Sequence, residues 1–351
     1  MIAEKTVFIL GAGASCPYGF PSGARLRKLI CHNAGFIERH LEYRKVNQCE
    51  DKQKADIQNF IKIFDRSHIR SIDMFMANNP KLAPVGKYII AFEILTAEQH
   101  TQFGEKADQA REIYSQPLEV TPSRNFLRRG TYQGEDWYSY LYNQFIEGLA
   151  GKNTIPDFSD NKVTFITFNY DRSLEYFLYE SFCNSFTEIS EDKIAKSLMQ
   201  LKILHVYGQV ASLKWQNPNN YIDYSSQLNE PLLQRAANNI KTIYEENQNP
   251  ELNEAKKLIS EAKRIFFLGF SYAPENMEIL GLPKIIPTET KVYGTGFGLE
   301  GNEISKFRKK IISSIYAKFP ENGRIGLLPI IEMQVKLENM DCLKLLRNYL
   351  E

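Results

Sequence analysis

Short apolar segments alternate with segments of helical period at the start of the chain and through its second half. Thr6–Leu10 (TVFIL) is an apolar, β-rich run that leads into a glycine turn and a helix-like stretch at residues 22–30. Further strands are expected at residues 162–168, 201–205, 211–215, 264–268 and 289–293, with helices at 172–182, 253–262 and 303–317. This alternation is typical of a parallel, doubly wound sheet. Residues 324–335 and 337–349 are expected to form one or two strands and a closing helix.

The intervening stretch, residues 31–158, has a different pattern. It contains helix-period segments at residues 58–67, 72–76, 84–98 and 136–149 and a polar, loop-like segment at 115–134, but no convincing strand. The sequence therefore predicts an α/β protein. Residues 1–30 and 159–351 form a Rossmann-like, doubly wound parallel sheet, and residues 31–158 form a large helical insertion subdomain.

Composition narrows the class of protein and of ligand. With 43 Lys+Arg against 42 Asp+Glu, the formal net charge is +1, so nucleic acid is not directly implied as a ligand. No apolar run approaches the roughly 20 residues of a membrane span. A secretory signal peptide has an apolar segment of at least about seven residues, and the apolar segment Thr6–Leu10 is shorter. We therefore expect this segment to be a buried strand of a cytoplasmic protein.

The cysteines and histidines do not indicate a metal centre. Five cysteines form no C-x-x-C pair, and five histidines have no metal-ligand spacing. We therefore expect neither a disulfide framework nor a bound metal.

In an open parallel sheet, ligands bind beyond the carboxyl ends of the strands, so the residues after each expected strand are informative. The first is the turn Gly11-Ala12-Gly13-Ala14-Ser15, where glycines let the backbone approach a pyrophosphate. A turn required only for close packing is the alternative. A dehydrogenase fingerprint is incomplete, because Cys16 stands where its third glycine belongs.

Polar side chains follow two later strands. Asn169 and Asp171 come directly after the strand at 162–168, where they can reach into a crevice, although Asp171 can also simply cap the next helix. His205 ends the strand at 201–205 and can accept a proton near neutral pH, although a lone histidine is usually structural.

Glycine and hydroxyl residues follow the last two strands. Gly269 and Ser271 come after the strand at 264–268, and Gly294 after the strand at 289–293. Such positions suit the ribose and adenine half of a dinucleotide, and plain loop turns are an equally good interpretation.

The motifs GAGAS, TFNYD, HVYG and FLGFSY, in this order, resemble those of the sirtuin-like family, most closely its bacterial anti-phage branch, whose members hydrolyse NAD. The resemblance spans residues 5 to about 300. It implies a Rossmann-type NAD-binding domain with Asn169 and His205 as the catalytic pair, Asp171 beside the nicotinamide amide, and the GAGAS loop around the phosphates.

Two departures argue against the deacylases of that family. The chain lacks their four-cysteine zinc ribbon, and Phe168 stands where they have glutamine. The expected function is thus an NAD glycohydrolase that forms nicotinamide and ADP-ribose. The alternatives are a catalytically silent subunit that senses NAD or ADP-ribose, and an NAD-dependent protein deacylase.

Uncontrolled NAD hydrolysis would kill the host, so the resemblance also implies control. The chain leaves little room for a sensor domain, so we expect activation by homo-oligomer assembly or by a regulatory partner, such as a translocase-type ATPase or a nucleotide-processing enzyme.

Overall fold

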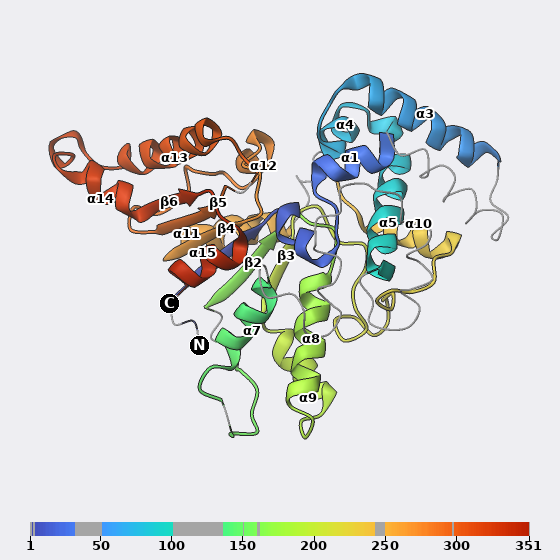
Figure 1. Ribbon diagram of the computed structural model, residues 1–351, viewed down its shortest axis with the longest axis horizontal. Helices are drawn as coiled ribbons and strands as arrows, with labels where there is room; N and C mark the ends of the chain where they lie inside the picture. The colour runs from blue at the N-terminus through green and yellow to red at the C-terminus, as the bar shows by residue number, and fades with distance from the viewer. Residues whose placement is uncertain are drawn as a thin grey trace.

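The computed structural model describes residue 2 and residues 4–31, 51–100, 136–149, 151–159, 162–242, 250–296 and 298–350. Its centre is a six-stranded, fully parallel sheet with the strand order β3-β2-β1-β4-β5-β6 (Figure 1). The strands are β1 (Thr6–Leu10), β2 (Val163–Thr167), β3 (Lys202–His205), β4 (Arg264–Leu268), β5 (Lys291–Thr295) and β6 (Val335–Glu338). From β1 the chain first adds strands on one side of the sheet and then, from β4, on the other, so the topological switch point lies between β1 and β4. This strand order confirms the predicted Rossmann-like, doubly wound fold.

The central strands are apolar because both faces of the sheet are covered. Every residue of β1, β2 and β4 is buried, which explains why these segments are continuous apolar runs rather than alternating ones. In register, the Phe8 ring stacks between Phe165 at 5.0 Å and Phe266 at 5.3 Å. These rings tie the three middle strands together and make this part of the sheet a rigid support for the loops at its carboxyl edge.

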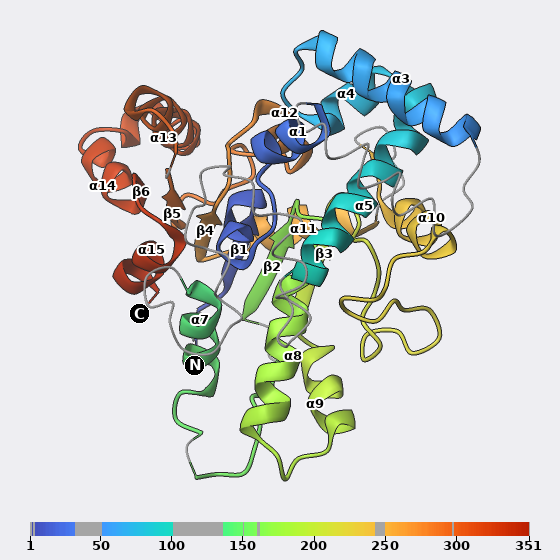
Figure 2. The ribbon, with the colours of Figure 1, turned by 45° about the vertical axis from the view of Figure 1, so that its right-hand side comes forward.

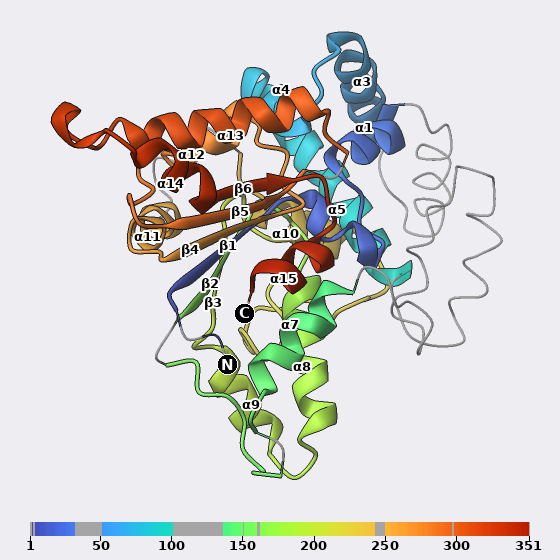
Figure 3. The same cartoon turned by 60° about the vertical axis from the view of Figure 1, so that its left-hand side comes forward.

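Helices cover the two faces of the sheet (Figure 3). One face carries α7 (Trp137–Ile146), α8 (Ser173–Ser185) and α15 (Cys342–Tyr349), and α7 contacts both of the others. The opposite face carries α11 (Pro250–Ser260) and α13 (Gly301–Tyr316). Other helices of the second half are α9 (Glu191–Leu198), α12 (Pro274–Ile279) and α14 (Leu327–Gln334).

A separate group of helices lies beyond the carboxyl ends of the strands (Figure 2). It comprises α1 (Gly23–Cys31), α3 (Asp51–Ser67), α4 (Ile72–Asn78), α5 (Ala83–His100) and α10 (Glu230–Asn239). Within residues 51–100 and 136–149 all regular elements are helical, as the sequence predicts. The helix α10 comes from the second half of the chain, yet it packs along α5.

One buried ion pair joins this helical group to the sheet domain. The Arg172 guanidinium, just before α8, contacts the Glu98 carboxylate of α5 at 2.9 Å, and both side chains are fully buried. Arg172 also donates to the backbone oxygens of Ser212, Ile222 and Asp223. One side chain thus connects α5, the start of α8 and the loop that follows β3.

Two segments differ from the predicted secondary structure. Residues 211–215 form a loop rather than a strand, because side chains engage their backbone: Arg172 binds the Ser212 oxygen, and Gln216 Oε1 accepts from the Leu213 amide. Residues 327–334 form α14 rather than a strand. Its inward residues, Leu327 and Ile331, are four apart, which is the spacing of a helix. The polar segment at 115–134 lies outside the described residues.

The glycine turn after β1 and the loop after β4 approach each other so closely that a side chain at Gly269 would not fit. A Cβ there would lie 2.0 Å from the Ala14 nitrogen, and the Gly269 φ of +56° is in the left-handed region. We expect Gly269→Ala to lower the free energy of unfolding by at least about 2 kcal/mol. Gly23→Ala, where nothing lies within 4 Å, is the control and should stay within about 0.5 kcal/mol of wild type. Equal denaturation midpoints for the two variants would contradict this packing.

Candidate functional site

The glycine turn after β1 uses its amides within the protein. The Gly11 and Gly13 amides donate to the backbone oxygens of Leu268 and Gly269, each at 3.0 Å, and the Ala14 and Ser15 amides donate inside the turn. A Cβ at Gly11 or Gly13 would lie 2.5 or 2.8 Å from the Gly269 oxygen. Close packing is therefore one physical reason for both glycines. The Ala12 oxygen accepts from the Ser15 amide and from the Cys16 thiol, and the Ser15 side chain accepts from Asn169.

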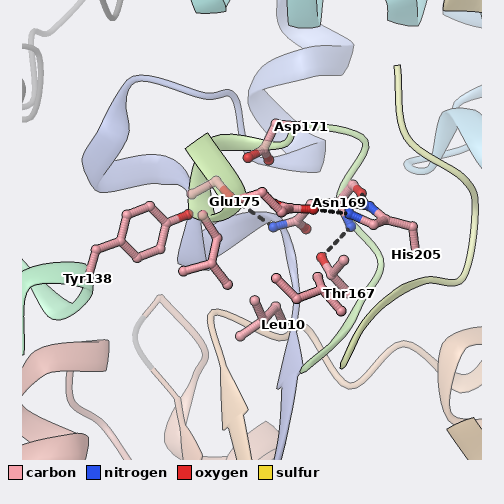
Figure 4. Close-up of a pocket in the computed structure, with 10 residues that line it drawn as sticks. Leu10, Tyr138, Thr167, Asn169, Asp171, Glu175 and His205 are labelled. Atoms are coloured by element: carbon pink, nitrogen blue, oxygen red, sulfur yellow. Dashed lines mark hydrogen bonds and ion pairs between the residues drawn. The ribbon is translucent and has the colours of Figure 1, made fainter. Parts of the chain in front are cut away.

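Asn169 joins this turn to the end of β2 (Figure 4). Its Nδ2 donates to the Gly11 oxygen at 3.1 Å and to Ser15 Oγ at 2.9 Å, and its own amide donates to Thr167 Oγ1 at 3.0 Å. The residue is only 7% exposed. Among the described residues, its Oδ1 is one of the few buried side-chain oxygens with no hydrogen-bond partner. The structure therefore places Asn169 beside the glycine turn.

Asp171 lies two residues further, at the start of α8. Its carboxylate accepts from the Ser173 amide at 3.1 Å and from the Ser173 hydroxyl. The N-cap of α8 is Arg172, so Asp171 lies one residue before the cap position that the sequence suggested for it. Burial raises the pKa of Asp171, although the hydrogen bonds from Ser173 and Ser15 oppose that shift. The contact with a nicotinamide amide stays a prediction.

His205 contacts Asn169 through the backbone rather than through the side-chain amide. Its Nδ1 lies 3.0 Å from the Asn169 carbonyl oxygen, and its Nε2 lies 2.7 Å from Glu175 Oε1. A carbonyl and a carboxylate oxygen are both acceptors, so both ring nitrogens are satisfied only when each carries a proton. The two predicted catalytic residues are thus adjacent, but His205 has no lone pair directed at a substrate in this arrangement.

Sequence reasoning missed Glu175, which is 2% exposed and lies in the first turn of α8. The available signal was its position, because the helix that follows β2 begins at the carboxyl edge of the sheet and an acidic residue in its first turn can reach the strand ends. Together with Asp171, it places a second buried carboxylate next to Asn169.

The ion pair with Glu175 shifts the titration of His205. Burial by itself would lower the pKa of His205, but the Glu175 carboxylate and the Asn169 carbonyl oxygen outweigh burial and raise the pKa above the usual 6.5.

This raised pKa predicts how stability depends on pH. Because the folded protein holds the proton more tightly than the unfolded chain, the stabilisation is complete below the unfolded pKa of about 6.5 and is lost as the pH rises through the folded pKa. The free energy of unfolding of wild type minus that of His205→Gln should therefore be largest at acidic pH and decrease toward alkaline pH. A difference that increases with pH would contradict the ion pair.

These residues surround one small cavity at the carboxyl ends of β1, β2 and β3. Its volume is about 10 Å³, close to what one water molecule needs. Tyr138 of α7 closes one side, and its hydroxyl lies 2.8 Å from Ser173 Oγ. The polar residues that line the cavity are Ser15, Tyr138, Thr167, Asn169, Asp171, Glu175 and His205.

Of the residues predicted to bind the other half of a dinucleotide, Gly269 contacts the glycine turn, and Ser271 is exposed in the loop after β4. Gly294 does not follow its strand, because β5 extends to Thr295. It is buried inside the sheet, where a Cβ would lie 2.1 Å from the Tyr272 hydroxyl. Packing against Tyr272 is therefore the reason for glycine at 294, and the predicted place of Gly294 in a loop after the strand is wrong.

Aromatic side chains fill the region next to Asn169, at the ends of β2, β3 and β4. The Phe168 ring lies 5.4 Å from both the Tyr207 and the Phe270 ring, and all three residues are 3–7% exposed. The Tyr170 hydroxyl binds the Asp73 carboxylate of α4. Tyr170 thereby joins the end of β2 to α4 of the helical group.

Within the described ranges, no cluster of three or more His, Cys, Asp or Glu residues could hold a metal ion. No helix in that part of the chain is long and apolar enough to cross a membrane. The sequence matches no family model, and no curated protein is significantly similar to it.

Proposed function

We propose that this protein is an NAD glycohydrolase, which cleaves the bond between nicotinamide and ribose and transfers the ribose carbon to water. The observation that carries the proposal is the position of the Asn169 amide. It binds the Gly11 oxygen and Ser15 Oγ at the junction of β1 and β2, and its Oδ1 is a buried acceptor without a partner. A buried acceptor of this kind needs a donor, and a ribose hydroxyl, a carboxamide or a water can supply one.

The surrounding groups suit this reaction. Nicotinamide leaves as a neutral molecule, so catalysis depends mainly on positioning and on stabilising the positive charge that develops on the ribose. Asp171 and Glu175 place two buried carboxylates at the cavity. In this proposal Asn169 orients the ribose and the water, Asp171 binds the carboxamide, and the pyrophosphate lies along the turn from Gly11 to Ser15.

The size of the cavity supports control by activation. Small-molecule sites are typically about 300–1,000 Å³, and this cavity of about 10 Å³ is far smaller. NAD does not fit into the cavity as the described residues line it, so in this proposal the side chains around it move before NAD binds. We propose that assembly into a homo-oligomer or a protein partner drives this rearrangement and that the enzyme acts as an abortive-infection effector in anti-phage defence.

One observation favours a second candidate, a catalytically silent subunit that senses NAD or ADP-ribose. Both nitrogens of His205 are engaged by Asn169 and Glu175, as expected of a structural histidine. In that case the site binds the nucleotide without turning it over.

Chromatography of NAD after incubation with the purified protein separates these candidates. Nicotinamide and ADP-ribose in equal amounts indicate the hydrolase, and bound but unchanged NAD indicates the sensor. Consumption only in the presence of an acylated peptide indicates a deacylase. The incubation is repeated with the proteins encoded beside the gene, and a lack of nicotinamide in every condition would contradict the proposed reaction.

A further inference from the structure

The cavity brings together two groups that can accept hydrogen bonds, the Asn169 amide oxygen and the Glu175 carboxylate. Asn169 Oδ1 is buried and has no partner. Glu175 binds His205 through Oε1, and its carboxylate also lines the cavity. A single water has two protons to donate and fits a volume of about 10 Å³.

We infer that the cavity binds one water between Asn169 Oδ1 and the Glu175 carboxylate, and that Glu175 accepts the proton of this water during hydrolysis. The second part of this inference rests on the proposed function. Because both protons of the water point at acceptors, its lone pairs are directed away from them, toward a reacting carbon. This is the arrangement that a general base requires.

The step is balanced. The water oxygen forms a bond to the ribose carbon as the bond from that carbon to the nicotinamide nitrogen breaks, and the electron pair of the broken bond goes to nicotinamide, which becomes neutral. One proton of the water passes to the Glu175 carboxylate, and ADP-ribose keeps the new hydroxyl.

His205 then becomes a positioning residue. Its Nε2 holds Glu175 at 2.7 Å, and its Nδ1 holds the Asn169 carbonyl oxygen at 3.0 Å, so one ring fixes the two residues that bind the water. The raised pKa of His205 agrees with a protonated ring that donates to both. The assignment of the base to His205 on sequence grounds is thereby replaced by Glu175.

The first test is a high-resolution crystal structure of the full chain. We expect an ordered water within hydrogen-bond distance of both Asn169 Oδ1 and the Glu175 carboxylate. A cavity without density, or an Asn169 Oδ1 that binds a protein group instead, overturns the inference whether or not the protein cleaves NAD.

The second test compares Glu175→Gln with Glu180→Gln, a carboxylate on the same helix α8 that does not line the cavity. Glu175→Gln should lower kcat by about 10²–10⁴-fold while the Kd for NAD changes little, and Glu180→Gln should match wild type. Added formate should restore activity to Glu175→Ala in proportion to its concentration, which a purely structural role would not produce.

A kcat for Glu175→Gln within about threefold of wild type overturns the role of Glu175 as base, since loss of a general base costs far more. If wild type releases no nicotinamide in any condition, including with the proteins encoded beside its gene, the proposed function fails, and the crystal structure alone decides whether the water site exists. The two failures are therefore distinguishable.

Discussion

Asn169→Ala is expected to abolish NAD hydrolysis, with a loss of about 10²-fold or more in kcat, because the amide positions both the ribose and the water. The variant also loses two buried hydrogen bonds, to the Gly11 oxygen and Ser15 Oγ. Their net contribution to folding is about 1–2 kcal/mol, so the variant should still fold. Nicotinamide release measures the activity, and circular dichroism with thermal unfolding measures the fold.

The matched control is Asn184→Ala, an exposed asparagine on α8 whose Nδ2 binds only the Glu180 oxygen of its own helix at 2.7 Å. It should keep the activity of wild type and nearly the same melting temperature. If Asn169→Ala folds and releases nicotinamide as fast as Asn184→Ala, the amide at 169 has no role in the reaction.

The largest effect on stability is expected at the ion pair between Arg172 and Glu98. Removing one partner of a buried ion pair typically costs about 3–5 kcal/mol. Both side chains are fully buried, so solvent cannot stabilise the remaining charge. Arg172→Met should therefore lower the melting temperature strongly, and Glu98→Gln should do so to a smaller extent because the amide keeps hydrogen-bonding capacity.

The double variant Arg172→Met/Glu98→Leu separates the contribution of the ion pair to stability from that of the other hydrogen bonds of Arg172. It removes both charges, so it should be more stable than Arg172→Met alone, but it leaves the Ser212, Ile222 and Asp223 oxygens without their donor. Asp192→Ala breaks an ion pair with Lys196 whose side chains are 87% and 77% exposed, and it should change stability by less than about 1 kcal/mol. Equal effects of Asp192→Ala and Arg172→Met would contradict this account.

The sheet could be predicted because its strands are buried on both faces. Thr6–Leu10 and Arg264–Leu268 match β1 and β4 residue for residue, since continuous apolar runs end abruptly at glycine turns. The same logic placed Asn169 and His205 at the carboxyl edge, because the ends of neighbouring parallel strands meet there.

The remaining features depend on contacts between distant segments, which a local pattern does not encode. The engagement of His205 by Glu175 requires α8 to pack over β3, and the packing of α10 on α5 joins segments more than a hundred residues apart. Gly294 has the local pattern of a loop glycine, but Tyr272 from the preceding loop occupies the space of its side chain.

A crystal structure of the full chain with ADP-ribose tests the central claim most directly, because it shows where the product binds. The account predicts the pyrophosphate along the turn from Gly11 to Ser15 and the terminal ribose within hydrogen-bond distance of Asn169 Oδ1, with the side chains around the cavity moved apart. ADP-ribose bound elsewhere on the protein, with Asn169 still enclosed as it is now, would contradict it.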